Sequence, residues 1–191
     1  MRRWPVITAI YLLGLLSTAA QAAEDTTLHN QLADHPSPYL AMHGHDPVAW
    51  QDWGEAALEK ARKSGKPLFI SSGYFACYWC HVMQHESYSD KRVAKWLNEH
   101  FIPVKVDREL QPGLDAYLID FVTATRGHAG WPLNVFLTPD GYPLLGFAYQ
   151  RRAAFLGLLK RLSNAWETER DDLERMALKA SLELKARSAA E

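Results

Sequence analysis

An α/β fold is the class that this sequence predicts, and three observations predict it. Three short runs rich in apolar residues are typical of buried strands: 66–72, 101–107 and 133–137. Stretches with apolar residues at helical spacing separate these runs. The only two cysteines of the chain, Cys77 and Cys80, lie just after the first run. Strands that alternate with helices predict a layered domain with a partly parallel sheet.

The elements around the cysteines follow in order along the first half of the chain. Residues 24–34 are polar and are expected to form a loose lead-in. A helix over 55–63 is expected to end at Gly65, a residue typical of C-caps. The first strand follows it directly. Cys80 then opens a short helix, and Asp90 is expected to cap the next one.

The second half of the chain supplies the rest of the sheet. Pro103 lies within the second strand and predicts an edge position or a bulge, because proline cannot donate to the strand ladder. A helix over 114–125 is expected to end at Gly127. After the third strand, the turn residues 139–141 predict that 143–149 pairs with it as a hairpin.

Two helices complete the pattern, over 152–166 and 173–186. The second is expected either to pack back on the domain or to contact a partner through an apolar face of Leu173, Met176, Ala180 and Leu184. The order strand–helix–strand–helix–hairpin–helix, with the cysteines after the first core strand, predicts a thioredoxin-like α/β fold. We expect a central mixed sheet flanked by helices, with a C-terminal helical extension.

Residues 1–22 have the pattern of a secretory signal peptide. Arg2 and Arg3 form a basic start, 6–16 is apolar, and 20–22 offers small residues for cleavage. The apolar core is shorter than the roughly 20 residues of a membrane span, which favours a cleaved signal over a retained anchor. We therefore expect a periplasmic or secreted protein with no stable membrane span after cleavage, in a compartment where disulfides persist.

The chain thus divides into a signal peptide (1–22), a thioredoxin-like domain (23–166) and a C-terminal amphipathic helix (167–191). Its 48% hydrophobic content and seven tryptophans are those of a packed globule. The formal net charge is −1, which gives no electrostatic driving force for nucleic-acid binding. We therefore expect no nucleic-acid partner.

The Cys77-x-x-Cys80 spacing at a helix start is the arrangement that thiol–disulfide exchange requires. Only a thiolate attacks a disulfide, and unpaired N–H groups at a helix start favour that thiolate. Cys77, on the loop side, is therefore the candidate nucleophile, and Cys80 is the candidate resolving thiol. Tyr78 and Trp79 between them offer an apolar surface to a substrate. No cofactor beyond the redox-active Cys77–Cys80 disulfide is expected.

Three other interpretations of this stretch stay open. A purely structural disulfide would stabilise little, because the gap closes a very small loop. A zinc site could recruit His81 and His85 beside the cysteines, although a second cysteine pair is missing. Cys-x-x-Cys-His is also the c-type haem attachment sequence, with Met83, Met42 or Met176 as a further axial ligand. The strand-rich surroundings favour dithiol chemistry over haem.

The positions of three histidines in the sequence indicate their roles. His81 follows Cys80 directly and is placed to tune the thiolate, since histidine titrates near neutrality. His43 and His45 lie between proline-rich turns. We interpret both as hydrogen-bonded loop residues in preference to metal ligands.

Trp131 and Pro132 are the predicted second half of the site. They follow a helix-breaking glycine and directly precede the third strand. Thioredoxin-like folds hold a cis-proline at this place, opposite the dithiol, where the substrate backbone lies. An ordinary trans proline is the alternative, because an isolated X-Pro bond is cis only about 5% of the time.

Four segments carry a resemblance to a known family: 37–40 (Ser-Pro-Tyr-Leu), 77–83, 105–109 and 130–141. On these residues the chain resembles the spermatogenesis-associated, DsbH-type family of thioredoxin-like proteins. The resemblance extends over about residues 37 to 143, most of the chain after the signal.

The resemblance implies that Cys77 and Cys80 are the redox pair and that Pro132 is the cis-proline. It also implies that His81 belongs to the family signature and binds no haem. Many members of the family continue into a large helical, sugar-enzyme-like domain, whereas this chain is expected to stand alone.

Two further departures concern the site. Residues 146–150 replace the family's Gly-Gly-Thr-Tyr-Phe-Pro after the hairpin, which puts the contacts at that rim in doubt. Thioredoxin keeps a buried aspartate beneath its dithiol, whereas 70–72 here reads Ile-Ser-Ser. Proton handling is therefore expected to differ, through His81, Glu86 or Asp107.

These observations predict an exported thiol–disulfide oxidoreductase. Its partners would be protein thiol or disulfide substrates and an upstream redox partner. Reduction of substrates is favoured over oxidation, because the sequence shows no strongly oxidising feature. The alternative is a non-enzymatic haem-, metal- or partner-binding module that uses the Cys-x-x-Cys-His stretch.

Overall fold

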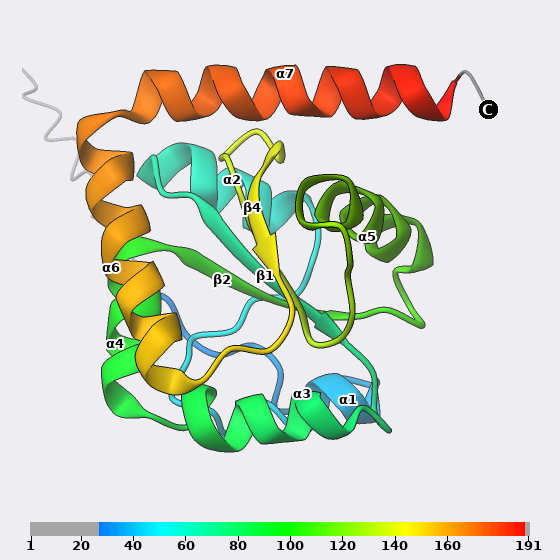
Figure 1. Cartoon of the computed structure of the whole chain (residues 1–191). Helices are drawn as coiled ribbons and strands as arrows, with labels where there is room; N and C mark the ends of the chain where they lie inside the picture. The colour runs from blue at the N-terminus through cyan, green and yellow to red at the C-terminus, as the bar shows by residue number, and fades with distance from the viewer. Residues whose placement is uncertain (1–26, 190–191) are drawn as a thin grey trace, which may run out of the picture.

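The computed structural model describes residues 27–189 and is built on a four-stranded mixed sheet (Figure 1). The strands are β1 (Leu68–Gly73), β2 (Ile102–Asp107), β3 (Leu133–Leu137) and β4 (Pro143–Phe147), in the order β2-β1-β3-β4. β1 runs parallel to β2 and antiparallel to β3, and β4 forms an antiparallel hairpin with β3. This topology is thioredoxin-like, so the predicted fold class is confirmed.

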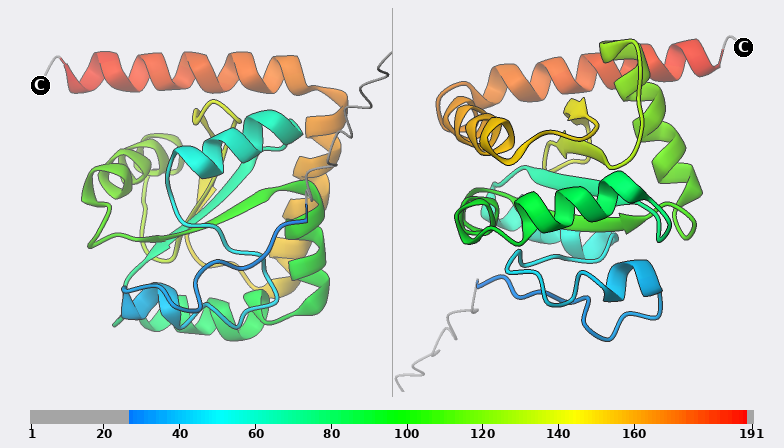
Figure 2. Two further views of the ribbon diagram at one scale, coloured as in Figure 1. Left: turned by 180° about the vertical axis from the view of Figure 1, so that it is seen from behind. Right: turned by 60° about the horizontal axis from the view of Figure 1, so that its bottom comes forward.

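Helices cover both faces of the sheet (Figure 2). They are α1 (Pro38–Ala41), α2 (Glu55–Ser64), α3 (Tyr78–Met83), the π-helix η1 (Gln84–Tyr88), α4 (Lys91–His100), α5 (Pro112–Arg126), α6 (Arg152–Thr168) and α7 (Arg170–Ser188). Residues of α1, α3, η1, α4 and α6 pack on one face, and residues of α2, α5 and α7 pack on the other. Because η1 continues α3, the helix after the cysteines runs on as far as Tyr88.

The alternation of side chains along the strands separates two hydrophobic cores. Phe69 of β1 points to one face, and its neighbours Leu68 and Ile70 point to the other. The dithiol-side core includes Tyr39, Trp50, Phe69, Cys80, Met83, Tyr88, Phe101, Phe136 and Phe155. The far-side core includes Ile70, Val104, Leu118, Phe121, Val122, Leu133, Val135 and Leu184.

β2 is an edge strand, as Pro103 predicts. Its outer side is nevertheless paired. The backbone N–H of Gln51 donates to the Pro103 carbonyl at 2.8 Å, and the N–H of Lys105 donates to the Gln51 carbonyl at 3.1 Å. An unpaired edge is a template for association with another chain, so this bridge protects the sheet on that side.

The sheet brings the two predicted halves of the site together at one end of its central strands, β1 and β3. Ser72, near the end of β1, pairs with Leu133, the first residue of β3. The loop that carries Cys77 leaves from the end of β1, and Pro132 directly precedes β3. α7 lies at the opposite end of the molecule from α1 and α3 (Figures 1 and 2).

The expectation of a loose lead-in over 24–34 is wrong for its described residues. Leu32 is fully buried in the dithiol-side core. The Asn30 side chain donates to the backbone carbonyls of His43 and Asp46, at 2.9 and 3.2 Å. These long-range hydrogen bonds have no periodic signature in the sequence, which explains why they were missed.

The last helix packs through part of the face that was expected. Met176 is 59% exposed, whereas Ala177, Ser181 and Leu184 are buried. α7 contacts β4, α5 and α6. Leu184 and Ala180 pack against the far-side core as expected, whereas the expectation that Met176 belongs to the packed face is wrong.

The predicted signal peptide over 1–22 lies outside the described residues. Over residues 27–189, none of the helices combines the length and the apolar character that crossing a bilayer requires.

Candidate functional site

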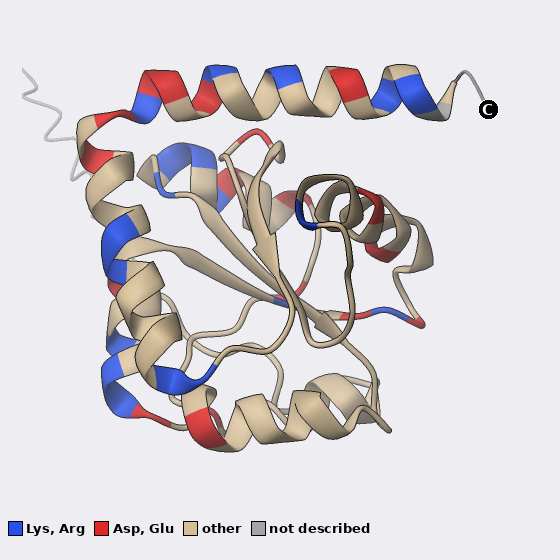
Figure 3. Cartoon of the chain, in the orientation of Figure 1, with Lys and Arg blue, Asp and Glu red and all other residues tan. Residues whose placement is uncertain are grey.

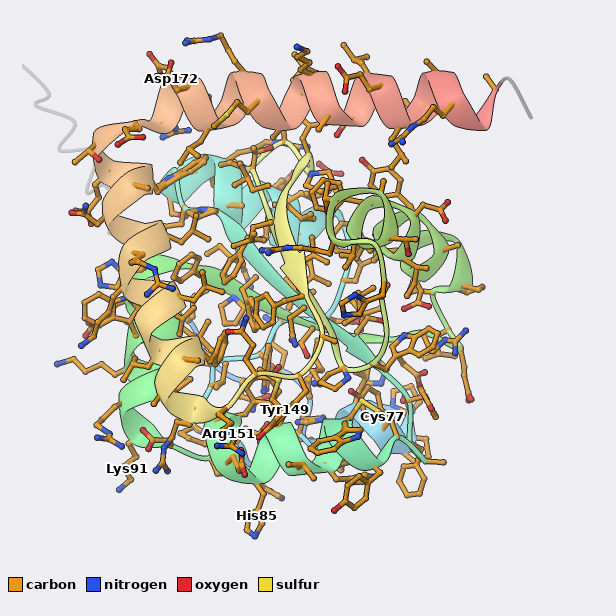
Figure 4. All side chains as sticks on the ribbon, in the orientation of Figure 1. Cys77, His85, Lys91, Tyr149, Arg151 and Asp172 are labelled. Atoms are coloured by element: carbon orange, nitrogen blue, oxygen red, sulfur yellow. A yellow bond between two sulfur atoms is a disulfide. The ribbon has the colours of Figure 1, made fainter. Side chains whose placement is uncertain are left out.

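Cys77 and Cys80 form a disulfide at the start of α3. Cys77 is the N-cap of this helix, and its sulfur accepts the backbone N–H of Cys80 at 3.2 Å. Cys77 is 4% exposed and Cys80 is fully buried. Figure 4 shows Cys77 at the end of the helix. A negative charge on the Cys77 sulfur would be stabilised there by the N–H group and by the positive end of the helix.

An exposed aromatic surface surrounds the disulfide. The side chains of Phe75, Tyr78 and Trp79 are 57%, 71% and 49% exposed. The Trp79 ring packs against Tyr149, with 4.8 Å between ring centroids, and the Tyr149 hydroxyl donates to Glu86 at 2.6 Å. Tyr149 lies over the α3–η1 helix in Figure 4, and α1 and α3 carry no charged residue in Figure 3.

Phe75 and Tyr149 were not predicted as members of this surface. Phe75 lies in the short loop before Cys77 and is exposed. An aromatic residue in a loop next to the cysteines is the sequence signal that could have identified it. Tyr149 lies in the segment that departs from the family pattern. It contacts Trp79 only because the chain after β4 returns across α3.

His81 is exposed, and its Nε2 atom lies 2.7 Å from the backbone carbonyl oxygen of Phe75. Within the described residues, no hydrogen bond joins His81 to either sulfur. His85, the other histidine of the zinc interpretation, points away from the rest of the molecule (Figure 4). Between residues 27 and 189, no group of three or more His, Cys, Asp or Glu side chains is arranged to hold a metal ion.

The bond between Trp131 and Pro132 is cis. The Trp131 indole is held from several sides. Its Nε1–H donates to the Asp115 carboxylate at 3.0 Å, and the Arg108 guanidinium lies 3.9 Å from the ring centroid. Tyr74, in the loop that leads to the cysteines, meets the same ring edge-on at 5.9 Å. Trp131 therefore connects the segment before β3 to the loop after β1.

Asp115 is the centre of this connection and was not predicted. It is 3% exposed, although it lies in the first turns of α5. Besides Trp131, it accepts the Ser72 hydroxyl at 2.6 Å and pairs with Arg108 at 3.2 Å. An aspartate at a helix start reads from sequence as a solvated charge, so this role needed the three-dimensional arrangement.

A fully buried lysine lies in the dithiol-side core. The Lys105 ammonium group donates to the Ser71 hydroxyl at 2.9 Å. It faces the rings of Tyr88, Trp50 and Tyr39, at 4.7, 5.2 and 5.3 Å from their centroids. Burial lowers the pKa of Lys105 to about 7. The negative charge of Asp46 acts in the opposite direction and limits that decrease.

His43 is a hydrogen-bonded loop residue, as predicted. Its Nδ1 atom lies 2.7 Å from the Asp46 carboxylate, which also accepts the Trp50 indole N–H at 2.9 Å and the Gln84 amide at 3.0 Å. Burial, followed by the positive charge of Lys105, lowers the pKa of His43 to about 4. The imidazole is therefore neutral near pH 7 and donates from Nδ1 to Asp46.

The thioredoxin-like sheet, the cysteine pair that caps α3 and the proline before β3 define a thioredoxin-fold protein with a cysteine pair able to form a disulfide. Residues 29–185 match the family model Thioredox_DsbH, described as "Protein of unknown function, DUF255". The chain belongs to this DsbH-type family, as its sequence resemblance predicts.

Curated relatives are similar over most of this chain. An "Uncharacterized protein B0495.5" of Caenorhabditis elegans is 41% identical over 155 residues, which are 78% of this chain and 21% of the relative. Spermatogenesis-associated protein 20 of Rattus norvegicus is 40% identical over 165 residues, 83% of this chain and 21% of the relative. The chain spans about a fifth of the length of these relatives.

Solved structures with a similar fold are more distant. A "DsbH Oxidoreductase" is 21% identical, with a TM-score of 0.48, over 61% of this chain and 85% of that chain. A thioredoxin from Thermus thermophilus is 22% identical, with a TM-score of 0.48, over 61% of this chain and 88% of that chain.

Proposed function

We propose that this protein is a thiol–disulfide oxidoreductase. One observation carries the proposal: Cys77 and Cys80 form a disulfide at the N-terminus of α3, with the Cys77 sulfur capping the helix. The cap position favours the thiolate that disulfide exchange needs. The buried Cys80 is held within bonding distance to close the ring again.

The two cysteines take different roles in this reaction. The Cys77 thiolate attacks one sulfur of a substrate disulfide, forms a mixed disulfide and releases the other sulfur as a thiolate. Cys80, as a thiolate, then attacks the Cys77 sulfur. The Cys77–Cys80 disulfide forms and the mixed disulfide breaks. The bonding electron pair of the mixed disulfide leaves with the second substrate sulfur, which is released as a thiolate.

The substrate surface of the proposal is aromatic. Tyr78 and Trp79 directly follow Cys77 and are exposed. Trp131 lies just before β3, at the same end of the sheet. Exposed aromatic side chains fit apolar segments of a protein substrate better than a small hydrophilic disulfide. We therefore propose protein thiols and disulfides as substrates and an upstream redox protein as partner.

We further propose that the protein reduces its substrates. The stretch from Gly73 to Met83 contains no lysine or arginine, so this stretch gives the Cys77 thiolate no fixed cationic partner. A strongly stabilised thiolate is what makes a dithiol an oxidant. Equilibration of the protein with glutathione mixtures measures the potential, and a value in the oxidase range would reverse the proposed direction.

Export is a proposal that rests on the sequence pattern of residues 1–22. A basic start, an apolar core and small residues at 20–22 are typical of a cleaved signal. The mass of the protein recovered from a secretion-competent host tests it. A mature N-terminus near residue 23 supports export, and an intact N-terminus contradicts cleavage.

Trapping of the mixed disulfide tests the assignment of the cysteines. Reduced Cys80→Ser is expected to accumulate a covalent adduct with disulfide-bonded insulin through Cys77, because the Cys77 thiolate opens an insulin disulfide and the resolving thiol is gone. Cys77→Ser is the matched control and is expected to form no adduct and to lose insulin reduction. Unchanged insulin reduction by Cys77→Ser would sink the proposal.

A further inference from the structure

The hydroxyl of Tyr39 is a buried polar atom without a partner. Tyr39 is 1% exposed, and its hydroxyl oxygen has no hydrogen-bond partner among the described residues. More than nine-tenths of buried polar groups in folded proteins are hydrogen-bonded, so each exception asks for an explanation. The hydroxyl of Tyr88 in the same core shows the usual situation, since it is bonded to both Ser71 and Asn134.

The Tyr39 hydroxyl lies next to the sulfur of Cys80. A Cβ atom added to Gly73 would collide with both groups at once: it would lie 2.7 Å from the Cys80 sulfur and closer still to the Tyr39 oxygen. Gly73 does not have a left-handed backbone, so glycine is required here for space. The residue that ends β1 therefore leaves room for the hydroxyl and the sulfur to meet.

α1 is anchored so that Tyr39 keeps this position. The Ser37 hydroxyl caps α1 by accepting the N–H of Leu40 at 3.2 Å, and it donates to the Asp107 carboxylate at 2.6 Å. Asp107 is in turn the strand partner of Gly73. The helix that presents Tyr39 is thus fixed to the part of the sheet that faces Cys80.

We propose that the Tyr39 hydroxyl donates a hydrogen bond to the Cys80 sulfur when the dithiol is reduced, and that this bond supports Cys80 as the resolving thiolate. In the disulfide, the sulfur is a weak acceptor, and the hydroxyl makes no hydrogen bond to it. A thiolate is a charged acceptor, and hydrogen bonds to charged groups are the strong ones. The inference rests on the proposed function, since it concerns the second step of that exchange.

The hydrogen bond from Tyr39 would stabilise the Cys80 thiolate, which burial otherwise disfavours. A thiolate in apolar surroundings is disfavoured, and Cys80 is fully buried. The helix-cap N–H is directed at Cys77, so it does not serve the second sulfur. In the step itself, Cys80 gives up its proton, attacks the Cys77 sulfur and expels the substrate sulfur, on which the proton ends. Tyr39 donates its hydrogen bond to the Cys80 sulfur until the new disulfide forms, and it is neither oxidised nor deprotonated.

The charges around Tyr39 are compatible with a donor that keeps its proton. Burial, followed by the neighbouring Tyr88, Asp107 and Asp46, raises the pKa of Tyr39 well above its ordinary value. The titratable groups that face it are His43 and Asp46 after α1, Tyr88 on η1, and Lys105 and Asp107 on β2, while His81 lies on the exposed side of α3. Tyr39→Phe leaves all of these groups in place.

Two-step kinetics with an aromatic disulfide separates the two cysteines. The reduced protein is mixed with 5,5′-dithiobis(2-nitrobenzoic acid) in a stopped-flow instrument. Attack by Cys77 releases one coloured thiolate, and attack by Cys80 on the mixed disulfide releases the second. Tyr39→Phe is expected to keep the first phase within about twofold and to slow the second roughly tenfold or more. Its pH midpoint for the second phase is expected to rise by about one unit.

Two further variants make the result specific. Tyr88→Phe also removes a buried hydroxyl from the dithiol-side core, but one that is bonded to Ser71 and Asn134. It is expected to lower stability and leave the second phase unchanged. Gly73→Ala places a methyl group between the hydroxyl and the sulfur and is expected to slow the second phase as Tyr39→Phe does.

The outcomes are distinguishable. A wild-type protein without a first phase overturns the proposed function, and the inference with it. A normal first phase with an unchanged second phase and midpoint in Tyr39→Phe overturns the inference alone. Equal slowing in Tyr39→Phe and Tyr88→Phe, without a shift of the midpoint, would assign the effect to packing and also overturn it.

Discussion

Lys105 shows at the scale of one residue how burial changes chemistry. The ammonium group is fully buried, with one hydroxyl partner and three aromatic faces around it. Burial lowers its pKa to about 7, whereas an unfolded lysine titrates near 10.4. Between these two values the unfolded chain holds a proton that the folded chain does not. Folding therefore becomes more favourable as the pH rises through this window.

Lys105→Met tests this pH dependence. The stability cost of the wild-type lysine is fully present below about pH 7 and is relieved as the pH rises. In the oxidised protein, the difference between the free energies of unfolding of the wild type and the variant is expected to change in favour of the wild type, by roughly 1 kcal/mol per pH unit between pH 7.5 and 9. Urea unfolding of both proteins across this range measures the gain. Parallel pH curves would contradict a lowered lysine pKa.

The residues of the site were predictable to different degrees. Cys77 and Cys80 can be identified because they are the only two cysteines and are separated by two residues. Trp131 and Pro132 can be identified by their place before a core strand. Lys105 does not, because an apolar–polar alternation along a strand reads as one solvated face. α1 and α3 cover that face, and their arrival from distant parts of the chain has no local signature. Tyr39 is distinguished in the sequence only as part of the Ser-Pro-Tyr-Leu segment that resembles a family pattern.

At the scale of the elements, periodicity was enough wherever one face of an element is clearly apolar. The four strands and helices α2, α4, α5 and α6 were expected within a few residues of where they lie. The π-helix η1 was not, because its widened turn differs from an α-helix by one residue only. α7 was expected as a helix, and Leu184 of its expected face is buried, but Met176 is exposed while Ala177 and Ser181 are buried.

A pair of leucines on α7 tests which face of that helix carries stability. Leu184 is 8% exposed in the far-side core, and Leu182 is 57% exposed on the same helix. Leu184→Ala is expected to lower the free energy of unfolding by about 2–3 kcal/mol, because it removes buried methyl groups and leaves a cavity. Leu182→Ala makes the same chemical change and is expected to stay within about 0.5 kcal/mol. Urea unfolding compares the two.

Equal losses for both variants would contradict this assignment, because alanine has a helix propensity at least as high as leucine and the substitution by itself predicts no loss. A loss confined to Leu182→Ala would place the opposite face of α7 against the domain.

At the scale of the whole molecule, the sheet separates a chemical half from a structural half. The cysteine pair, Lys105 and Tyr39 belong to the face covered by α1, α3 and η1. The far-side core beneath α2, α5 and α7 is apolar and contains no sulfur. β1 contributes to both, because its successive side chains point to opposite faces. The sheet is thus the shared wall of two cores, and Trp131 packs against both of them.

The separation of the two cores by the sheet predicts additive stability effects for changes away from Trp131. Tyr88→Phe removes hydrogen bonds to Ser71 and Asn134 on the dithiol side and is expected to cost about 1–2 kcal/mol. Leu184→Ala acts on the far side, in the other hydrophobic core. The free energy of unfolding of the double variant should therefore equal the sum of the two losses within about 0.5 kcal/mol, by urea unfolding of all four proteins. A coupling above about 1 kcal/mol would show that the sheet transmits strain between its faces, and the dithiol would then respond to changes beneath α7.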